Sequence, residues 1–75
     1  MGFDQDIDAR GLLCPLPVLK AAKRLREMAP GEVLRLQADD PAAVVDVPHY
    51  CRESGNVLSH TAEDDAATLY FIRKV

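Results

Sequence analysis

The chain has 75 residues, of which 48% are hydrophobic, 28% charged and 5% aromatic, and its formal net charge at pH 7 is −3. A chain of this length has room for one modest core, so residues 1–75 are expected to form a single domain. The acidic balance, the few aromatic side chains and the absence of tryptophan argue against a broad nucleic-acid-binding surface.

The sequence has no feature of a secreted or membrane protein. It contains no run of about 18 apolar residues, and its start, MGFDQDID, is acidic where a signal peptide is basic and then apolar. The Met-Gly start lacks the Ser or Thr of a myristoylation signal, because Asp6 stands in its place. We therefore expect a cytoplasmic protein that binds no membrane, with Cys14 and Cys51 as separate thiols.

The first half of the chain predicts a strand, a helix and a second strand. Residues 4–9 show the weak alternation of a short strand. Over residues 14–29, apolar side chains recur at three- and four-residue steps, which predicts an amphipathic helix that Pro30 and Gly31 stop. Residues 32–38 alternate again and are expected to form the second strand.

A second helix is predicted over residues 41–53. Asp40 is expected to be its N-cap, with the following proline as its first residue. Pro48 lies inside this range and has no backbone N–H, so it is expected to kink the helix or to make Asp46 the cap of a second segment. In both cases Gly55 ends the helix.

The last third of the chain predicts a hairpin. Residues 56–62 and 67–75 are rich in β-forming residues and are joined by the polar turn EDDA. The order of elements is then β-α-β-α-β-β. Each amphipathic helix must bury its apolar stripe on a sheet, so the expected fold class is α/β of the α+β type: a two-layer sandwich with two helices packed on one face of a four-stranded mixed sheet.

Cys14 stands where the first helix begins, beside two prolines. If Cys14 is the N-cap, Pro15 and Pro17 fall in the first turn, where a missing N–H removes no helical hydrogen bond. Because the residue before a proline avoids the helical conformation, the helix could instead start at Pro17 with Leu16 outside it. In both cases the helix dipole and the free amides of Leu16 and Val18 are expected to lower the pKa of the thiol, which would make Cys14 a nucleophile.

Neighbouring charges favour the same interpretation. Four cations near Cys14 in the sequence would favour its thiolate: Arg10, Lys20, Lys23 and Arg24. The alternative is a small buried thiol without reactivity, which is common for free cysteine. No second cysteine lies close enough for a C-x-x-C motif, and His49 and His60 cannot be placed beside Cys14 from the sequence. The thiol is thus expected to be a carrier, and neither a protease nucleophile nor a disulfide exchanger.

The remaining polar and sulfur-bearing residues have structural explanations. Cys51 lies at helical spacing near the apolar stripe of Val44 and Val47, so we expect it to pack in the core and not to act as a resolving thiol. Asp39, Asp40 and Asp46 are better explained by helix capping and a turn than by a metal cluster. No Cys and His spacing resembles a zinc site, and no metal or cofactor is expected.

The stretch DARGLLCPLPVLKAAKRL resembles the C-P-x-P motif of the TusA/SirA family of small sulfur-carrier proteins, including Asp8 and Gly11 ahead of the cysteine. DDPAAVVDVPHYCRESGNVL is similar to the second segment of that family, and YFIRKV to its last strand, so the resemblance covers nearly the whole chain. It implies a β-α-β-α-β-β two-layer fold and a cysteine that accepts a persulfide and passes it on. In this chain that role falls on Cys14.

The resemblance also implies partners. The donor would be a cysteine desulfurase or a rhodanese, and the acceptor a Dsr- or Tus-type relay protein or a thiolation enzyme, in tRNA thiolation, sulfur oxidation or cofactor assembly. The residues expected to support Cys14 are its neighbours in the motif: Arg10, Gly11, Pro15, Leu16, Pro17 and Val18. The basic stripe of Lys20, Lys23 and Arg24 either steers the chain toward acidic partner surfaces or is a solvated helix face. We expect a monomer that does not contact nucleic acid directly.

Two other classes of function stay open at this point. A Cys-Pro pair can supply a thiolate ligand to haem, which would make the chain a haem-responsive regulatory module, although no axial partner is evident. A small α/β sandwich can also bind RNA, against which the acidic charge and the few aromatic residues argue.

Overall fold

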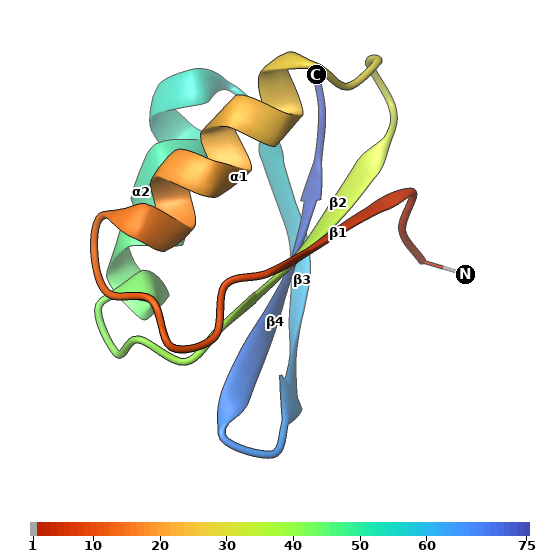
Figure 1. Cartoon of the computed structure of the whole chain (residues 1–75). Helices are drawn as coiled ribbons and strands as arrows, with labels where there is room; N and C mark the ends of the chain where they lie inside the picture. Colours follow the sequence, from red (N-terminus) through yellow and green to blue (C-terminus); the bar gives the residue numbers. More distant parts are fainter. Residues whose placement is uncertain (1) are drawn as a thin grey trace.

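The chain forms two layers in a computed structural model, which describes residues 2–75. Six elements follow one another: β1 (Gln5–Asp8), α1 (Leu16–Arg26), β2 (Val33–Ala38), α2 (Ala43–Ser54), β3 (Val57–Asp64) and β4 (Ala67–Arg73). Both helices lie on the same face of a four-stranded sheet (Figure 1). The predicted order of elements and the predicted two-layer architecture are confirmed.

The sheet is mixed, with strand order β1-β2-β4-β3. β1 pairs with β2 in parallel, with α1 as the crossover between them, and the other two pairings are antiparallel. The β2 side chains that face the helices are Leu34 and Leu36, which stand opposite Ile72 and Tyr70 of β4. This register gives the helices an apolar sheet face on which to pack.

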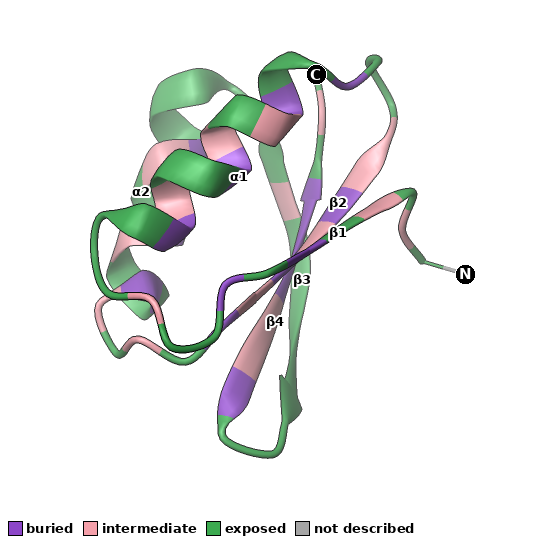
Figure 2. Cartoon of the chain, viewed as in Figure 1, coloured by how far each residue is buried: buried purple, intermediate pink, exposed green. Residues whose placement is uncertain are grey.

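The core lies between that sheet face and the helices, as the buried residues in Figure 2 show. Its most fully enclosed large side chains come from α1, α2 and the two central strands: Pro17, Leu25, Leu34, Leu36, Val47 and Ile72. Full burial of such a side chain stabilises a fold by about 1.5–3 kcal/mol. The amphipathic patterns of the sequence are therefore confirmed as the packing faces of both helices.

The first helix is shorter than the predicted range 14–29. Pro15 is the N-cap of α1, and Glu27 is its C-cap, so Cys14 lies one residue ahead of the cap. Both predicted starting points are therefore wrong by one residue. At the other end the N–H of Glu27 donates to the carbonyl of Arg24, three residues earlier, at 3.0 Å. This spacing is that of a tightened last turn, after which the chain turns toward β2.

The second helix is one continuous segment. Asp40 is not its N-cap, because that position belongs to Ala42, whose N–H donates to Asp40 Oδ1 at 3.2 Å. Pro48 lies inside the helix, and Asp46 lies in the first turn, so Asp46 caps no second segment. Gly55 ends α2 as predicted, in the left-handed conformation with φ 84° that glycine adopts readily.

The hairpin of β3 and β4 has a tighter turn than predicted. β3 extends into the EDDA segment and leaves only Asp65 and Ala66 before β4, with Asp65 at φ 53°. β4 begins at Ala67 as predicted but ends at Arg73, two residues earlier than predicted. On the open face of the sheet, His60 stacks on Phe71 with ring centroids 4.2 Å apart. Within residues 2–75, no helix has the length and apolar character needed to cross a bilayer.

Candidate functional site

The loop that carries Cys14, between β1 and α1, lies beside the loop between β2 and α2 (Figure 1). Because β1 and β2 are parallel, both strands end at the same edge of the sheet, which brings these loops together. The N–H of Gly11 donates to Asp39 Oδ1 at 3.0 Å, and the N–H of Cys14 donates to Asp40 Oδ2 at 2.6 Å. The two aspartates therefore fix the position of the loop that carries the thiol.

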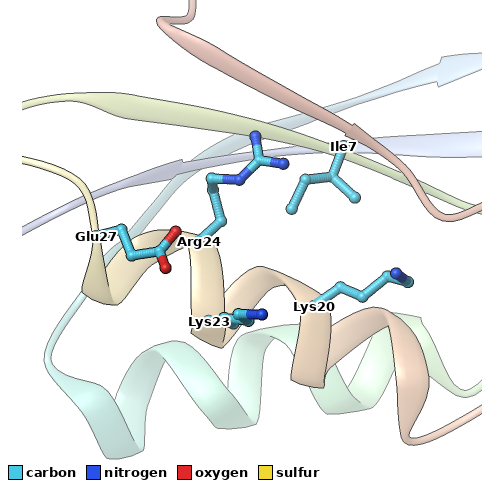
Figure 3. A pocket seen from close by; sticks show the side chains of 5 residues that line it. All are labelled: Ile7, Lys20, Lys23, Arg24 and Glu27. Carbon is cyan, nitrogen blue, oxygen red and sulfur yellow. The ribbon is translucent and has the colours of Figure 1, made fainter.

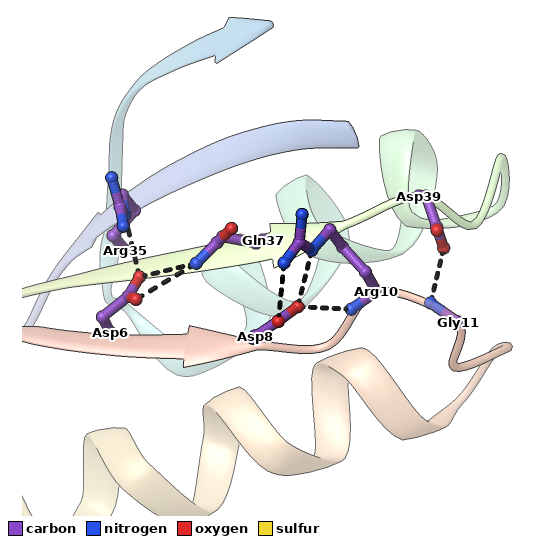
Figure 4. A network of polar contacts seen from close by, with 7 residues as sticks. All are labelled: Asp6, Asp8, Arg10, Gly11, Arg35, Gln37 and Asp39. Carbon is purple, nitrogen blue, oxygen red and sulfur yellow. Dashed lines mark hydrogen bonds and ion pairs between the residues drawn. The ribbon is translucent and has the colours of Figure 1, made fainter. Parts of the chain in front are cut away.

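The chain enters this loop through a second set of polar contacts (Figure 4). Gly11 has φ 83°, a left-handed conformation that only glycine adopts without strain. Arg10 donates to both carboxylate oxygens of Asp8, at 2.9 and 2.8 Å, which lowers the pKa of Asp8 to about 2. The expected role of Arg10 beside the thiol is wrong: among the described residues it pairs with Asp8 and does not contribute to the pKa shift of Cys14.

The thiol of Cys14 is exposed, and its charged neighbours are acidic. The Asp46 carboxylate accepts a hydrogen bond from the thiol and raises the pKa of Cys14 above its ordinary value. Desolvation of the sulfur and the charge on Asp40 shift the pKa in the same direction. The predicted lowering of the pKa is therefore wrong, because the fold brings carboxylates from the second loop and helix to the sulfur.

The first turn of α1 also differs from the prediction. The N–H of Leu16 donates to the carbonyl of Leu13 at 2.9 Å, so it is not free to stabilise a thiolate. Leu16 itself is 46% exposed, beside the cysteine loop, whereas Pro17 is fully buried in the core. The two prolines thus have different surroundings, and Pro17 contributes to packing.

Cys14 opens onto a groove of about 330 Å³ between the two helices. Its lining consists of the thiol, one side of α1 and one face of α2: Cys14, Pro15, Val18, Asp46, His49, Tyr50 and Glu53. The contribution of α2 to this groove was not predicted from the sequence. A signal for it was present, since these four residues of α2 recur at three- and four-residue steps and so share one helix face.

The basic stripe lies elsewhere. Lys20, Lys23 and Arg24 line a separate groove of about 290 Å³ with Ile7 and Glu27, on the side of α1 that lies along β1 (Figure 3). The guanidinium of Arg24 donates to the side chain of Gln5 at 3.0 Å. The two grooves share no lining residue, so the structure does not bring these cations to the thiol.

The second cysteine has the role that its spacing predicts. Cys51 is 4% exposed and belongs to the core, where burial raises the pKa of its thiol. Both cysteines are free. Within residues 2–75, no three His, Cys, Asp or Glu side chains are grouped so that they could hold a metal ion.

Comparison with known proteins identifies the family. The family model described as Sulfurtransferase TusA matches residues 5–74 of this chain. The chain belongs to the TusA family. It is 42% identical over 72 residues to the sulfur carrier protein TusA of Allochromatium vinosum, a match that spans 96% of this chain and 95% of that protein. The TusA/SirA resemblance seen in the sequence is confirmed.

Two further relatives agree with this. A putative sulfur carrier protein of Aquifex aeolicus is 35% identical over 71 residues, and the match spans 95% of this chain but 36% of that longer protein. The crystal structure of a SirA-like protein from Desulfitobacterium hafniense superimposes with a TM-score of 0.83 at 26% identity, over 93% of this chain and 96% of the other. The fold described above is therefore a fold of this family.

Proposed function

We propose that this chain is a sulfur carrier, which holds a sulfane sulfur as a persulfide on Cys14 and relays it from a donor protein to an acceptor protein. The observation that carries this proposal is the exposed thiol of Cys14, in a loop that Asp39 and Asp40 hold in place at the mouth of an open groove. The membership in the sulfurtransferase family TusA supports it.

The relay is a pair of sulfur exchanges. In the first, the Cys14 sulfur loses its proton and attacks the terminal sulfur of a donor persulfide; a new S–S bond forms, the donor S–S bond breaks, and the donor leaves as a thiolate. In the second, an acceptor thiolate attacks the terminal sulfur on Cys14, and Cys14 becomes the leaving thiolate. No external oxidant or reductant is consumed, since the sulfane sulfur only changes its carrier.

An open site suits this chemistry, because two different proteins must reach the same sulfur in turn. Leu13 and Leu16 lie on either side of the cysteine in the chain and are 68% and 46% exposed, so they offer a docking protein apolar contacts next to the reacting atom. Gly11 and Pro15 shape the loop that presents the sulfur.

The expected partners are a cysteine desulfurase or a rhodanese as donor and a protein of a sulfur relay or a thiolation enzyme as acceptor. We expect the carrier to act in the reducing cytoplasm, and the absence of a disulfide between its two cysteines among the described residues is compatible with that location. Lys20 and Lys23 are exposed on the far side of α1, where they can steer an acidic partner surface without touching the thiol. The variant K20A/K23A should slow loading by a protein donor at low salt and leave the alkylation rate of Cys14 unchanged.

The proposed function is tested by loading the protein and locating the sulfur. Incubation with a desulfurase and cysteine, or with a rhodanese and thiosulfate, should add one sulfur, about 32 Da by mass spectrometry, to Cys14. Cys14→Ser should abolish the addition, and Cys51→Ala, as the matched control, should retain it. A protein that acquires no sulfur from either donor, or acquires it on Cys51, would contradict the proposal.

A further inference from the structure

The acidic side of the Cys14 site has a chemical consequence for sulfur exchange. The groove beside the thiol has ionisable side chains from α2 alone: Asp46 lines it together with Cys14, and His49 and Glu53 lie further along the same helix face. Asp40, in the loop before α2, adds a second carboxylate. α1 contributes only the uncharged Pro15 and Val18 to this groove, so no Lys or Arg in its lining opposes Asp46.

A carboxylate in this position disfavours negative charge on the sulfur. For the unloaded protein, it lowers the fraction of thiolate, which is the attacking form of cysteine. For the loaded protein, it makes Cys14 a poorer leaving group, because a thiol of higher pKa leaves more slowly in sulfur exchange. Asp46 therefore slows both the acceptance and the release of sulfur as long as its charge is unopposed.

We propose that Asp46 is a specificity-determining residue that confines sulfur exchange at Cys14 to partner proteins whose docking places a Lys or Arg side chain against its carboxylate. This inference rests on the proposed function, and it adds which partners can use the thiol. When such a cation pairs with Asp46, the thiol proton is released to solvent, the sulfur attacks the donor persulfide, and the donor thiolate leaves and is protonated in its own site. The reverse exchange with an acceptor follows the same path.

The geometry supports a specific effect of Asp46. Asp46 is only partly exposed and lies in the first turn of α2, so its carboxylate is held by a packed helix, while Asp40 holds the cysteine loop from the other side. The groove remains open, which allows a partner side chain to reach the carboxylate. Inorganic polysulfide and uncharged thiols such as 2-mercaptoethanol carry no cation that could pair with Asp46, so they are expected to exchange slowly with Cys14.

The test compares Asp46→Asn with Asp46→Glu and with the matched control Asp65→Asn, which removes an exposed carboxylate of the hairpin turn that is absent from the groove lining. The rate of Cys14 alkylation by iodoacetamide is measured against pH, with Cys51 replaced by Ala throughout. Asp46→Asn should lower the midpoint of this pH dependence, whereas Asp46→Glu and Asp65→Asn should stay close to the parent. Each unit of decrease should raise the rate at pH 7 about threefold, because a tenfold gain in thiolate is partly offset by its weaker nucleophilicity.

Transfer assays then address specificity. Inorganic polysulfide should load Asp46→Asn faster than the parent, and the loaded variant should lose its sulfur faster to 2-mercaptoethanol, while a protein donor loads both at similar rates. If the parent and Asp46→Asn have equal midpoints of Cys14 alkylation and lose their sulfur to the small thiol at equal rates, the inference is overturned. The two proposals can fail separately, because alkylation needs no persulfide. An unchanged midpoint with normal loading of Cys14 would contradict the role of Asp46 alone, and a shifted midpoint without loading of the parent would contradict the proposed carrier function. Circular dichroism confirms that each variant is folded.

Discussion

The backbone N–H of Cys14 donates a 2.6 Å hydrogen bond to the carboxylate of Asp40, a residue 26 positions further along the chain. The same carboxylate also accepts the N–H of Ala42, just before α2. One side chain thus ties the loop that carries the sulfur to the start of the helix that lines its groove. The position of the thiol relative to Asp46 depends on this connection.

Replacement of Asp40 should therefore displace the sulfur. In Asp40→Ala the amide of Cys14 loses its partner, so we expect slower loading by a protein donor and a loss of about 0.5–1.5 kcal/mol in the free energy of unfolding. Asp40→Asn keeps an acceptor oxygen and should recover most of the stability. Single-turnover loading and urea denaturation measure the two effects, and an alanine variant that equals the parent in both would show that the hydrogen bond does not position the loop.

Pro17 and Pro30 should differ in their effect on stability. The side chain of Pro17 is fully buried, so Pro17→Ala removes packed carbon atoms and should cost about 1–2 kcal/mol, although alanine favours the helix. The exposed Pro30, which follows the end of α1, provides the control, since Pro30→Ala removes no buried atom. Thermal denaturation compares the two variants, and equal melting temperatures would argue against a packing role for Pro17.

Cys51 should matter for stability and not for transfer. Cys51→Ala removes a buried sulfur from the core and should lower the free energy of unfolding by about 1–2 kcal/mol, with loading through Cys14 retained. Cys14→Ser should give the opposite result, because the Cys14 thiol is exposed. Melting curves report the stability of each variant, and mass spectra report its loading with sulfur. Loss of transfer at unchanged melting temperature in the Cys51 variant would assign a redox role to that thiol.

Acidification should lower the free energy of unfolding in part by protonating the Asp6 carboxylate. A hydrogen bond from Arg35, at 2.8 Å, lowers the pKa of Asp6 below its ordinary value of 3.8, and Gln37 adds to the shift. Because the folded-state pKa is the lower one, the stabilisation is complete above that ordinary value and is lost as the pH falls through the folded-state pKa. Asp6→Asn should cost about 0.2–1 kcal/mol at pH 7.

The difference between the Asp6 variant and the parent should shrink in urea titrations below about pH 4, where the parent carboxylate becomes protonated as well. Asp65→Asn, in the hairpin turn, is the matched control, since asparagine also tolerates the positive φ of that position. A difference between Asp6→Asn and the parent that stays constant down to pH 2 would mean that the charge of Asp6 contributes nothing.

The sequence by itself was enough for the order of elements, the two-layer architecture and the burial of Cys51, and it was enough to propose Cys14 as the reacting residue. These conclusions depend on local information, namely the period of the apolar residues, the positions of proline and glycine, and one short motif. The boundaries of α1 and the cap of α2 were less accurate. Asp40 accepts the N–H of Cys14 with one carboxylate oxygen and the N–H of Ala42 with the other, and the first of these contacts joins distant parts of the chain, so only the packed structure shows it.

The electrostatics of the thiol were decided by the tertiary structure alone. The sequence predicted that the cations closest to Cys14 in the chain would also lie beside it in the fold. In the structure Arg10 pairs with Asp8, and Lys20 and Lys23 line another groove. The parallel pairing of β1 with β2 instead brings Asp40 and α2, with Asp46, to the sulfur. A pKa depends on the charges within a few ångströms of the group, and for a residue between two elements these come from distant parts of the chain.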